Sequence, residues 1–288
     1  MGAEKKKKNR KKTLAEQADK YVLYEAAVQS PDVEAPFFRK VFRKRFSKDP
    51  RILREDFCGT AAVCCQWVRS KRDRLAFGID LDPVPLAWAR ENNLAALPPR
   101  ARERVQLIQG DVREVGGPPA DVVAAQNFSF FVFKTREELR TYFEAARRHL
   151  ADEGLFVLDM MGGSESYLED HREKRKVGKG EVAGLAHPAF QYVWEQRRFD
   201  PITHHAKNFI HFRFRDGSRI RRAFSYDWRL WTLPEVQELL IEAGFDEVQV
   251  YWEGTDPETG EGDGRYRPRR HAPADPAWIA YVVATKAG

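Results

Sequence analysis

Apolar positions follow two alternating periods between residues 51 and 159. Short apolar runs of strand length are separated by segments whose apolar residues recur every three to four positions, the spacing of a helix packed on a sheet. The strands predicted here cover residues 51–55, 75–80, 105–110, 121–125 and 154–159. Strands that alternate with helices predict a parallel, doubly wound α/β sheet.

The helices between these strands are predicted from their start signals. They cover residues 60–69, 83–92 and 135–150, and two more, over 15–29 and 37–46, precede the first strand. Thr60 and Thr135 are placed to cap the helices that they open, because a threonine hydroxyl accepts a hydrogen bond from a backbone N–H in the first turn. Pro83 suits the first turn of the helix over 83–92.

The pattern changes after residue 160. Residues 190–199 alternate like an antiparallel strand, and Asp216-Gly217 is a hairpin signal between two further strands. A helix over 233–243 stops at Gly244, and residues 248–252 and 278–284 are closing strands. The intervening stretch, 255–276, is rich in Gly, Pro and charge, so we expect a long loop there.

Composition excludes global disorder, since 42% of the residues are hydrophobic and 12% aromatic. The net charge of +6 comes from one run, because removing the seven Lys and Arg residues between Lys5 and Lys12 leaves −1. We therefore expect residues 1–14 to be a disordered basic tail, for which contact with nucleic acid is the less favoured alternative. The chain lacks a signal peptide pattern and an apolar run of membrane-spanning length, so we expect a cytoplasmic protein with no membrane partner. Its three cysteines fit no zinc site, and no metal is predicted.

Three chemically suggestive positions follow successive predicted strands. Gly59 lies in the turn that opens a helix, where unpaired backbone N–H groups favour an anion. Asp80 lies 21 positions later at the tip of the next strand, which suits a carboxylate that binds a ribose diol. Asp111 follows the third strand. Together they line the crevice at which open α/β sheets bind ligands.

With these residues in place, the sequence resembles the class I S-adenosylmethionine-dependent methyltransferases. The matching motifs are LREDFCGTA at 53–61, GIDLDP at 78–83, QGDV at 109–112, ADVVAAQN at 120–127, LADEGLFVLD at 150–159 and LIEAGF at 240–245. The resemblance implies a Rossmann-like, mostly parallel seven-stranded sheet with an antiparallel β-rich insertion. It also implies S-adenosylmethionine as the cofactor and methyl transfer by in-line displacement as the reaction. On this basis residues 15–50 would cover the cofactor site, 51–161 and 232–288 would form the core, and 162–231 would form a substrate lid.

The resemblance also implies site residues. Glu55 would face the methionine amino group, Asp80 the ribose hydroxyls and Asp111 the adenine amino group. The full set expected at the cofactor is Glu55, Cys58, Gly59, Asp80, Leu81, Asp111, Val112, Asn127 and Tyr24. The residues expected at the transferred methyl or the acceptor are Asn127, Phe128, Tyr226 and His204.

Several of these residues have structural alternatives. Tyr24, with Tyr21, closes over the cofactor or packs in the core. His204, beside His205, is a general base near neutral pH or an exposed turn residue. Cys58 has a lowered thiol pKa at the helix start or is structural.

The sequence departs from the family in the glycine loop, where Phe57 and Ala61 stand at positions that usually hold glycine. Phe57 would crowd a close backbone approach, and Asp56 would share the acidic role of Glu55. The altered loop also motivates the alternative of a non-catalytic cofactor-binding or scaffold protein.

The acceptor is expected to be a small molecule, since Asn127-Phe-Ser-Phe130 lacks the two prolines typical of enzymes that methylate base amino groups. The alternative is an RNA or protein methyltransferase that uses the basic tail and the arginines of 265–270. The sequence leaves the oligomeric state open.

Overall fold

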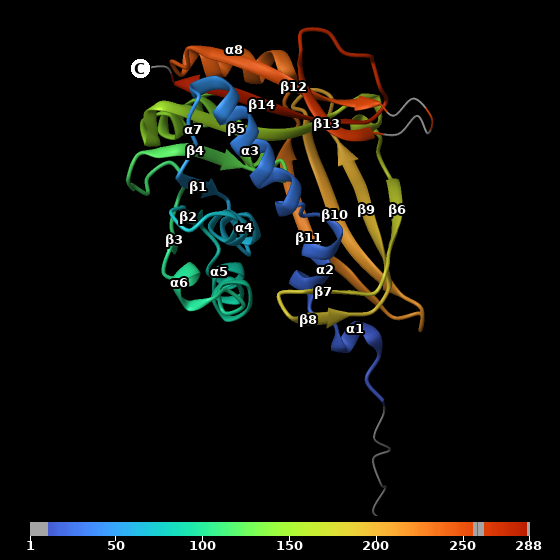
Figure 1. Ribbon diagram of the computed structural model, residues 1–288. Helices are drawn as coiled ribbons and strands as arrows, with labels where there is room; N and C mark the ends of the chain where they lie inside the picture. The colour runs from blue at the N-terminus through green and yellow to red at the C-terminus, as the bar shows by residue number, and fades with distance from the viewer. Residues whose placement is uncertain (1–10, 256–257, 259–261, 287–288) are drawn as a thin grey trace, which may run out of the picture.

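An eight-stranded sheet forms the centre of the computed structural model, which describes residues 11–255, 258 and 262–286 (Figure 1). The strand order is β13-β12-β14-β5-β4-β1-β2-β3. In that order the strands are β13 (Gly262–Arg269), β12 (Glu247–Thr255), β14 (Trp278–Lys286), β5 (Leu150–Gly162), β4 (Ala120–Ala125), β1 (Ile52–Asp56), β2 (Leu75–Asp80) and β3 (Val105–Gln109). Strands β5, β4, β1, β2 and β3 are parallel, and β14 and β12 are antiparallel additions. The predicted doubly wound fold is therefore confirmed.

The eighth strand, β13, corrects one prediction. It pairs antiparallel with β12 inside the stretch expected to be a long loop. Its glycines, proline and arginines hide the strand pattern, but Tyr266 packs against Phe37 and Tyr281, with ring centroids 6.0 and 4.6 Å apart. These tertiary contacts, together with the free edge of β12, favour a strand where local propensity does not.

Helices cover both faces of the sheet. On β4, Val122 and Ala124 belong to the apolar cluster that includes residues of α3 (Pro31–Phe46) and α4 (Ala62–Ser70), whereas Val123 and Ala125 belong to the cluster with residues of α7 (Arg136–His149) and α8 (Leu233–Glu242). This alternation is the pleat of a strand buried on both sides. The remaining short helices are α5 (Pro83–Ala89), η1 (Arg90–Leu94), α6 (Pro99–Arg102), η2 (Ser129–Val132) and η3 (Ser164–Tyr167).

Three predicted helix starts differ in the structure, and the helix expected over 37–46 begins at Pro31. The helix expected over 15–29 is divided into α1 (Leu14–Gln17) and α2 (Lys20–Ala27), because Thr13 and Asp19 each cap a separate start. Thr60 does not cap α4, since Ala61 holds that position with a left-handed φ of 57°. Thr135 caps α7 as predicted, in a capping box with Glu138.

The insertion forms a second sheet of four antiparallel strands, in the order β11-β10-β9-β6. The strands are β6 (His171–Val177), β9 (Phe190–Phe199), β10 (His205–Phe214) and β11 (Arg219–Arg229), and a separate ribbon joins β7 (Gly180–Val182) to β8 (Leu185–His187). The predicted Asp216-Gly217 hairpin joins β10 to β11, with Gly217 at a φ of 81°. Strand β6 was not predicted, because its sequence HREKRKV is an exposed edge with no apolar alternation.

Helices α2 and α3 lie between the two sheets (Figure 1). Tyr24 of α2 contacts Phe224 of β11, with ring centroids 4.7 Å apart, and Phe37 of α3 stacks on Tyr281 of β14 at 4.4 Å. The N-terminal segment therefore joins the core sheet to the insertion. The first ten residues of the predicted tail lie outside the described residues. Within the described part of the chain, every helix is too short or too polar to cross a bilayer.

Candidate active site

The carboxyl ends of β1, β2 and β3 meet at Asp80, as predicted. One carboxylate oxygen of Asp80 accepts a hydrogen bond from the Gly59 N–H at 2.7 Å, and the other accepts from the Asp82 N–H at 2.9 Å. The Gly110 N–H donates to the Asp80 carbonyl oxygen at 2.9 Å. The Leu81 backbone N–H is a third donor to this carboxylate, and the four lone pairs of its two oxygens leave capacity for a further hydrogen bond from a ligand hydroxyl.

The loop after β1 has the left-handed backbone conformation that favours glycine, although Phe57 and Ala61 stand at two of its positions. Phe57, Gly59 and Ala61 all adopt left-handed φ values, of 58°, 51° and 57°. The ring of Phe57 packs on Phe133 and Tyr142, with centroids 5.9 and 5.5 Å apart. A Cβ built on Gly59 would meet no atom within 4 Å. The backbone at Gly59 is therefore accessible to a ligand.

Glu55 and Asp56 point to opposite faces of the sheet, as neighbours on a strand must. Glu55 is buried and accepts a hydrogen bond from the Cys64 N–H in the first turn of α4, at 2.9 Å. Asp56 pairs with Arg54 at 2.7 Å and accepts from the Tyr142 hydroxyl at 3.1 Å. Burial raises the pKa of Glu55 to about 7 and that of Asp56 to about 6. The structure therefore separates Asp56 from the role that it was expected to share with Glu55.

Arg54 is a site residue that sequence reasoning missed. Its guanidinium is 3% exposed and donates to the carbonyl oxygens of Val112 and Val115 at 3.0 and 2.7 Å. It thereby fixes the loop that carries Asp111 and the buried Val112. Asp111 is paired with Arg113 at 2.6 Å, and this contact lowers the pKa of the Asp111 carboxyl. The signal was the run Arg54-Glu55-Asp56, three successive charged residues where a predicted strand of the parallel sheet runs into its turn.

Cys58 is a packing residue. Burial and the nearby carboxylates of Glu55 and Asp80 raise the pKa of its thiol well above the usual value, which corrects the alternative of a lowered pKa. Its Sγ would lie 2.8 Å from a Cβ placed on Gly78, so β2 needs a glycine where this thiol packs.

Asp159, at the end of β5, holds the loop that follows β4. Its two carboxylate oxygens accept hydrogen bonds from the N–H groups of Asn127 and Phe128, both at 2.9 Å. Asn127 and Phe128 both have a φ of 58°, a conformation that non-glycine residues adopt only when the surroundings fix it. Burial raises the pKa of Asp159 to about 7. Asp159 was absent from the predicted site, although it ends a predicted strand.

A cavity of ≈ 580 Å³ opens beside this loop. Four of the predicted site residues line it: Tyr24, Asn127, Phe128 and Tyr226. Tyr24 and Tyr226 share a side-chain hydrogen bond, and burial raises the pKa of both hydroxyls. The volume is in the range of small-molecule sites, about 300–1,000 Å³.

Of the residues expected at the transferred methyl or the acceptor, His204 is not brought to the cavity. Outside its lining, His204 occupies the turn between β9 and β10, where its ring packs on Tyr167 and Phe199. Leu81, which was expected at the cofactor, also lies outside the lining and is 68% exposed beside Asp80.

A second cavity, of ≈ 610 Å³, lies between α8, β12 and the segment 268–272, away from the predicted cofactor residues.

Aromatic side chains dominate the cavity walls. The insertion supplies one wall and the antiparallel end of the core sheet supplies another. Together with the loop and α2 they contribute Tyr24, Phe128, Tyr192, Trp194, Tyr226, Trp228, Tyr266, Trp278 and Tyr281.

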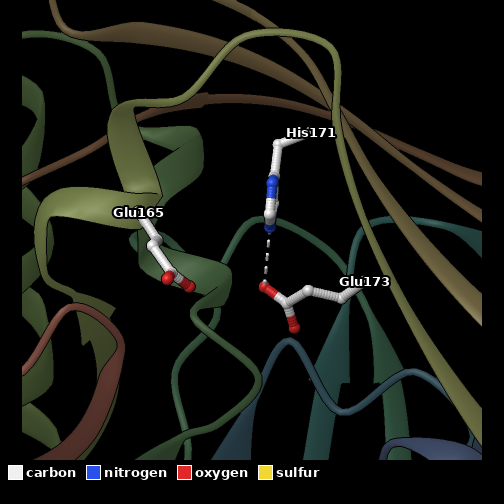
Figure 2. Close-up of side chains that lie close together, drawn as sticks. All are labelled: Glu165, His171 and Glu173. Carbon is white, nitrogen blue, oxygen red and sulfur yellow. Dashed lines mark ion pairs between the residues drawn. The ribbon is translucent and has the colours of Figure 1, made fainter.

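Carboxylates line both the inner part and the rim of the cavity. Glu34 and Asp159 are buried, with exposed fractions of 4% and 7%. At the rim, Glu165, His171 and Glu173 point toward one another, and their ligand atoms lie within 4.8 Å (Figure 2). A closed structural zinc site needs four ligands, and the Glu173 side chain is 57% exposed, so we interpret this group as an acidic rim.

The residues present fit S-adenosylmethionine at the ends of β1 to β4. Gly59 has open space at its backbone just before α4, the Asp80 carboxylate follows β2, and Asp111 follows β3, so the three positions at which cofactor contacts were predicted lie at one edge of the sheet. The cavity adjoins this row at Asn127 and Phe128, so an acceptor there would lie next to the methionine end.

Comparison with known proteins supports this interpretation. A family model described as a methyltransferase domain matches residues 56–158. Three solved structures share the fold over nearly the whole chain. The S-adenosylmethionine-bound amino pentose methyltransferase CalS10 from Micromonospora echinaspora is 21% identical, with 92% of this chain and 94% of that chain covered and a TM-score of 0.63. DesVI from Streptomyces venezuelae is 20% identical, with 92% and 95% covered and a TM-score of 0.64.

The third, the sugar N-methyltransferase KedS8 from a Streptoalloteichus species, is 20% identical, with 100% of both chains covered and a TM-score of 0.61. The search of curated proteins found no match. The comparisons confirm the predicted fold, and the family model supports a methyltransferase domain over residues 56–158.

Proposed function

We propose that the chain transfers a methyl group from S-adenosylmethionine to a small-molecule acceptor bound in the ≈ 580 Å³ cavity, and the methyltransferase-domain model that matches residues 56–158 supports this proposal. The observation that carries the proposal is the junction at Asn127 and Phe128. These two residues end the row of predicted cofactor residues and also line the cavity. S-adenosylmethionine supplies a methyl group that is electrophilic because it is bonded to a sulfonium.

Alignment and exclusion of water are the main tasks of the chain in this in-line displacement. Asp80 and Asp111 would hold the ribose and adenine, and the fixed loop at Asn127 would set the position of the methyl. Helix α2 and residues 162–231 would enclose the acceptor, since Tyr24 and Tyr226 line the cavity from these two parts. The solved neighbours named for amino pentose and sugar N-methyl transfer support a small acceptor over RNA or protein.

Calorimetric titration of S-adenosylmethionine into the wild type and into Asp80→Ala tests the proposal. We expect binding to the wild type, at least tenfold weaker binding to Asp80→Ala, and none with NAD as the control ligand. Asp82→Ala is the matched variant, because Asp82 caps α5 through the Val84 N–H and has no role toward the ribose. A wild type that binds no S-adenosylmethionine would favour the scaffold alternative.

A further inference from the structure

The inner part of the cavity holds two buried acidic side chains and no buried basic side chain among its described lining residues. Glu34 and Asp159 are the two buried acidic residues that line it. Lys174 and Arg175 also line it, but both are exposed, and Arg175 is directed at the Ala27 carbonyl oxygen and the Tyr192 ring. Buried charges are screened far less than exposed ones, so the two carboxylates dominate the field inside the cavity.

Glu34 is also incompletely bonded. It lies in the first turn of α3, and its Oε2 is buried without a hydrogen-bond partner in the described structure. Burial, and then the neighbouring carboxylates of Asp159 and Glu55, raise the pKa of Glu34 well above the usual value. A buried acceptor without a partner is destabilising, because no hydrogen bond offsets its loss of hydration. A ligand that donates a hydrogen bond and brings a positive charge would remove this destabilisation.

The walls suit the same kind of ligand. On the insertion, Trp228 lies 4.4 Å from Tyr226 and 5.9 Å from Trp194, measured between ring centroids. On the opposite wall, Tyr266 and Tyr281 are 4.6 Å apart, and both interact electrostatically with Glu34 and Asp159. The faces of tryptophan and tyrosine rings attract cations, including alkylated ammonium groups.

From these three features we infer that the acceptor is a small amine, recognised as its ammonium ion by Glu34 and enclosed by the tryptophan and tyrosine rings of the cavity. This inference rests on the proposed methyl transfer and names its substrate class. Glu34 is the anchoring residue, because both oxygens of Asp159 are already held by the loop at Asn127.

The transfer step follows from this placement. The bound ammonium gives one proton to the Glu34 carboxylate, which frees the nitrogen lone pair. The nitrogen then bonds to the methyl carbon as the carbon–sulfur bond breaks, and the electron pair of that bond stays on sulfur. The products are the methylated amine and S-adenosylhomocysteine, and Glu34 releases its proton to solvent.

A pair of probes that differ only in charge tests the recognition step. Choline and 3,3-dimethylbutan-1-ol have the same shape, but only choline is positively charged. We expect choline to bind the wild type at least tenfold more tightly than the alcohol, measured by calorimetry with S-adenosylhomocysteine present. Glu34→Gln should abolish this preference, and Glu34→Asp, which keeps the charge, should retain most of it.

Glu173→Gln is the matched control, because it removes a carboxylate at the exposed rim and should leave the preference within about twofold, as screened surface charges contribute little. Equal binding of the two probes, failure of choline to bind, or a preference that survives Glu34→Gln would overturn the inference. Loss of S-adenosylmethionine binding in Glu34→Gln would also overturn it, since Glu34 would then serve the cofactor or the fold. A wild type that binds choline but not S-adenosylmethionine would refute the proposed function alone.

Discussion

Replacing Asp159 with asparagine tests whether this carboxylate holds the loop between the cofactor residues and the cavity. An asparagine side chain has one acceptor oxygen, whereas Asp159 uses two for the N–H groups of Asn127 and Phe128. One part-buried N–H would therefore lose its partner, at a cost of at most about 1–3 kcal/mol. For a chain of this size that cost lowers the melting temperature by roughly 2–10 °C.

Asp159→Asn should also lower the rate of methyl transfer, by a larger factor than any loss of folded protein explains. Asn127 and Phe128 are both held at a φ of 58°, and the strain of such residues is on the order of 1–3 kcal/mol each. Without both hydrogen bonds the loop relaxes. Each 1.4 kcal/mol of lost transition-state stabilisation is about tenfold in rate. We therefore expect kcat/KM for methyl transfer to fall by a factor of about 10 or more.

The assays are a thermal melt and a steady-state measurement of S-adenosylhomocysteine release. Asp121→Asn is the matched control, because one carboxylate oxygen of Asp121 also accepts two backbone hydrogen bonds, from Arg51 and Ile52 at 2.7 and 2.8 Å. Those bonds lie at the start of β1, the end of the sheet opposite the site, so this variant should keep its activity. Full activity in Asp159→Asn, or equal losses in the two variants, would refute the reasoning.

Two further predictions concern the buried charges of β1. Burial raises the pKa of Glu55 to about 7, whereas an unfolded glutamate titrates near 4.3, so folding takes up a proton. This contribution to stability is complete below about pH 4 and is lost as the pH rises through about 7. Urea titrations should therefore show the wild type losing stability relative to Glu55→Gln from about pH 4 to about pH 7, and a difference that stays constant over this range would contradict the assignment. Arg54→Met leaves Asp56 buried without its ion-pair partner and frees the carbonyl oxygens of Val112 and Val115, so we expect a loss of about 3–5 kcal/mol in the free energy of unfolding. The double variant Arg54→Met/Asp56→Leu should recover most of that loss, and a double variant no more stable than the single one would show that the ion pair is not its source.

The alternation of apolar runs with helical segments was sufficient to predict the parallel sheet, because each strand is buried by helices that are its neighbours in the chain. The order of Gly59, Asp80 and Asp111 on successive strands also predicted that the three would meet, since parallel strands bring their carboxyl ends to one edge. Tertiary context decided the outcome at other positions. Strands β6 and β13 have polar sequences and form only because β9 and β12 offer edges to pair with.

What the sequence determined by itself is the sheet and the row of residues at its edge, because local periodicity and chain order fix both. What only the tertiary structure decided is the cavity. Glu34 comes from α3, Asp159 from β5, Tyr226 from β11 and Tyr281 from β14, and no spacing along the chain relates them. Their meeting depends on how the N-terminal helices pack between the two sheets, and such contacts between distant segments leave no periodic pattern in the sequence.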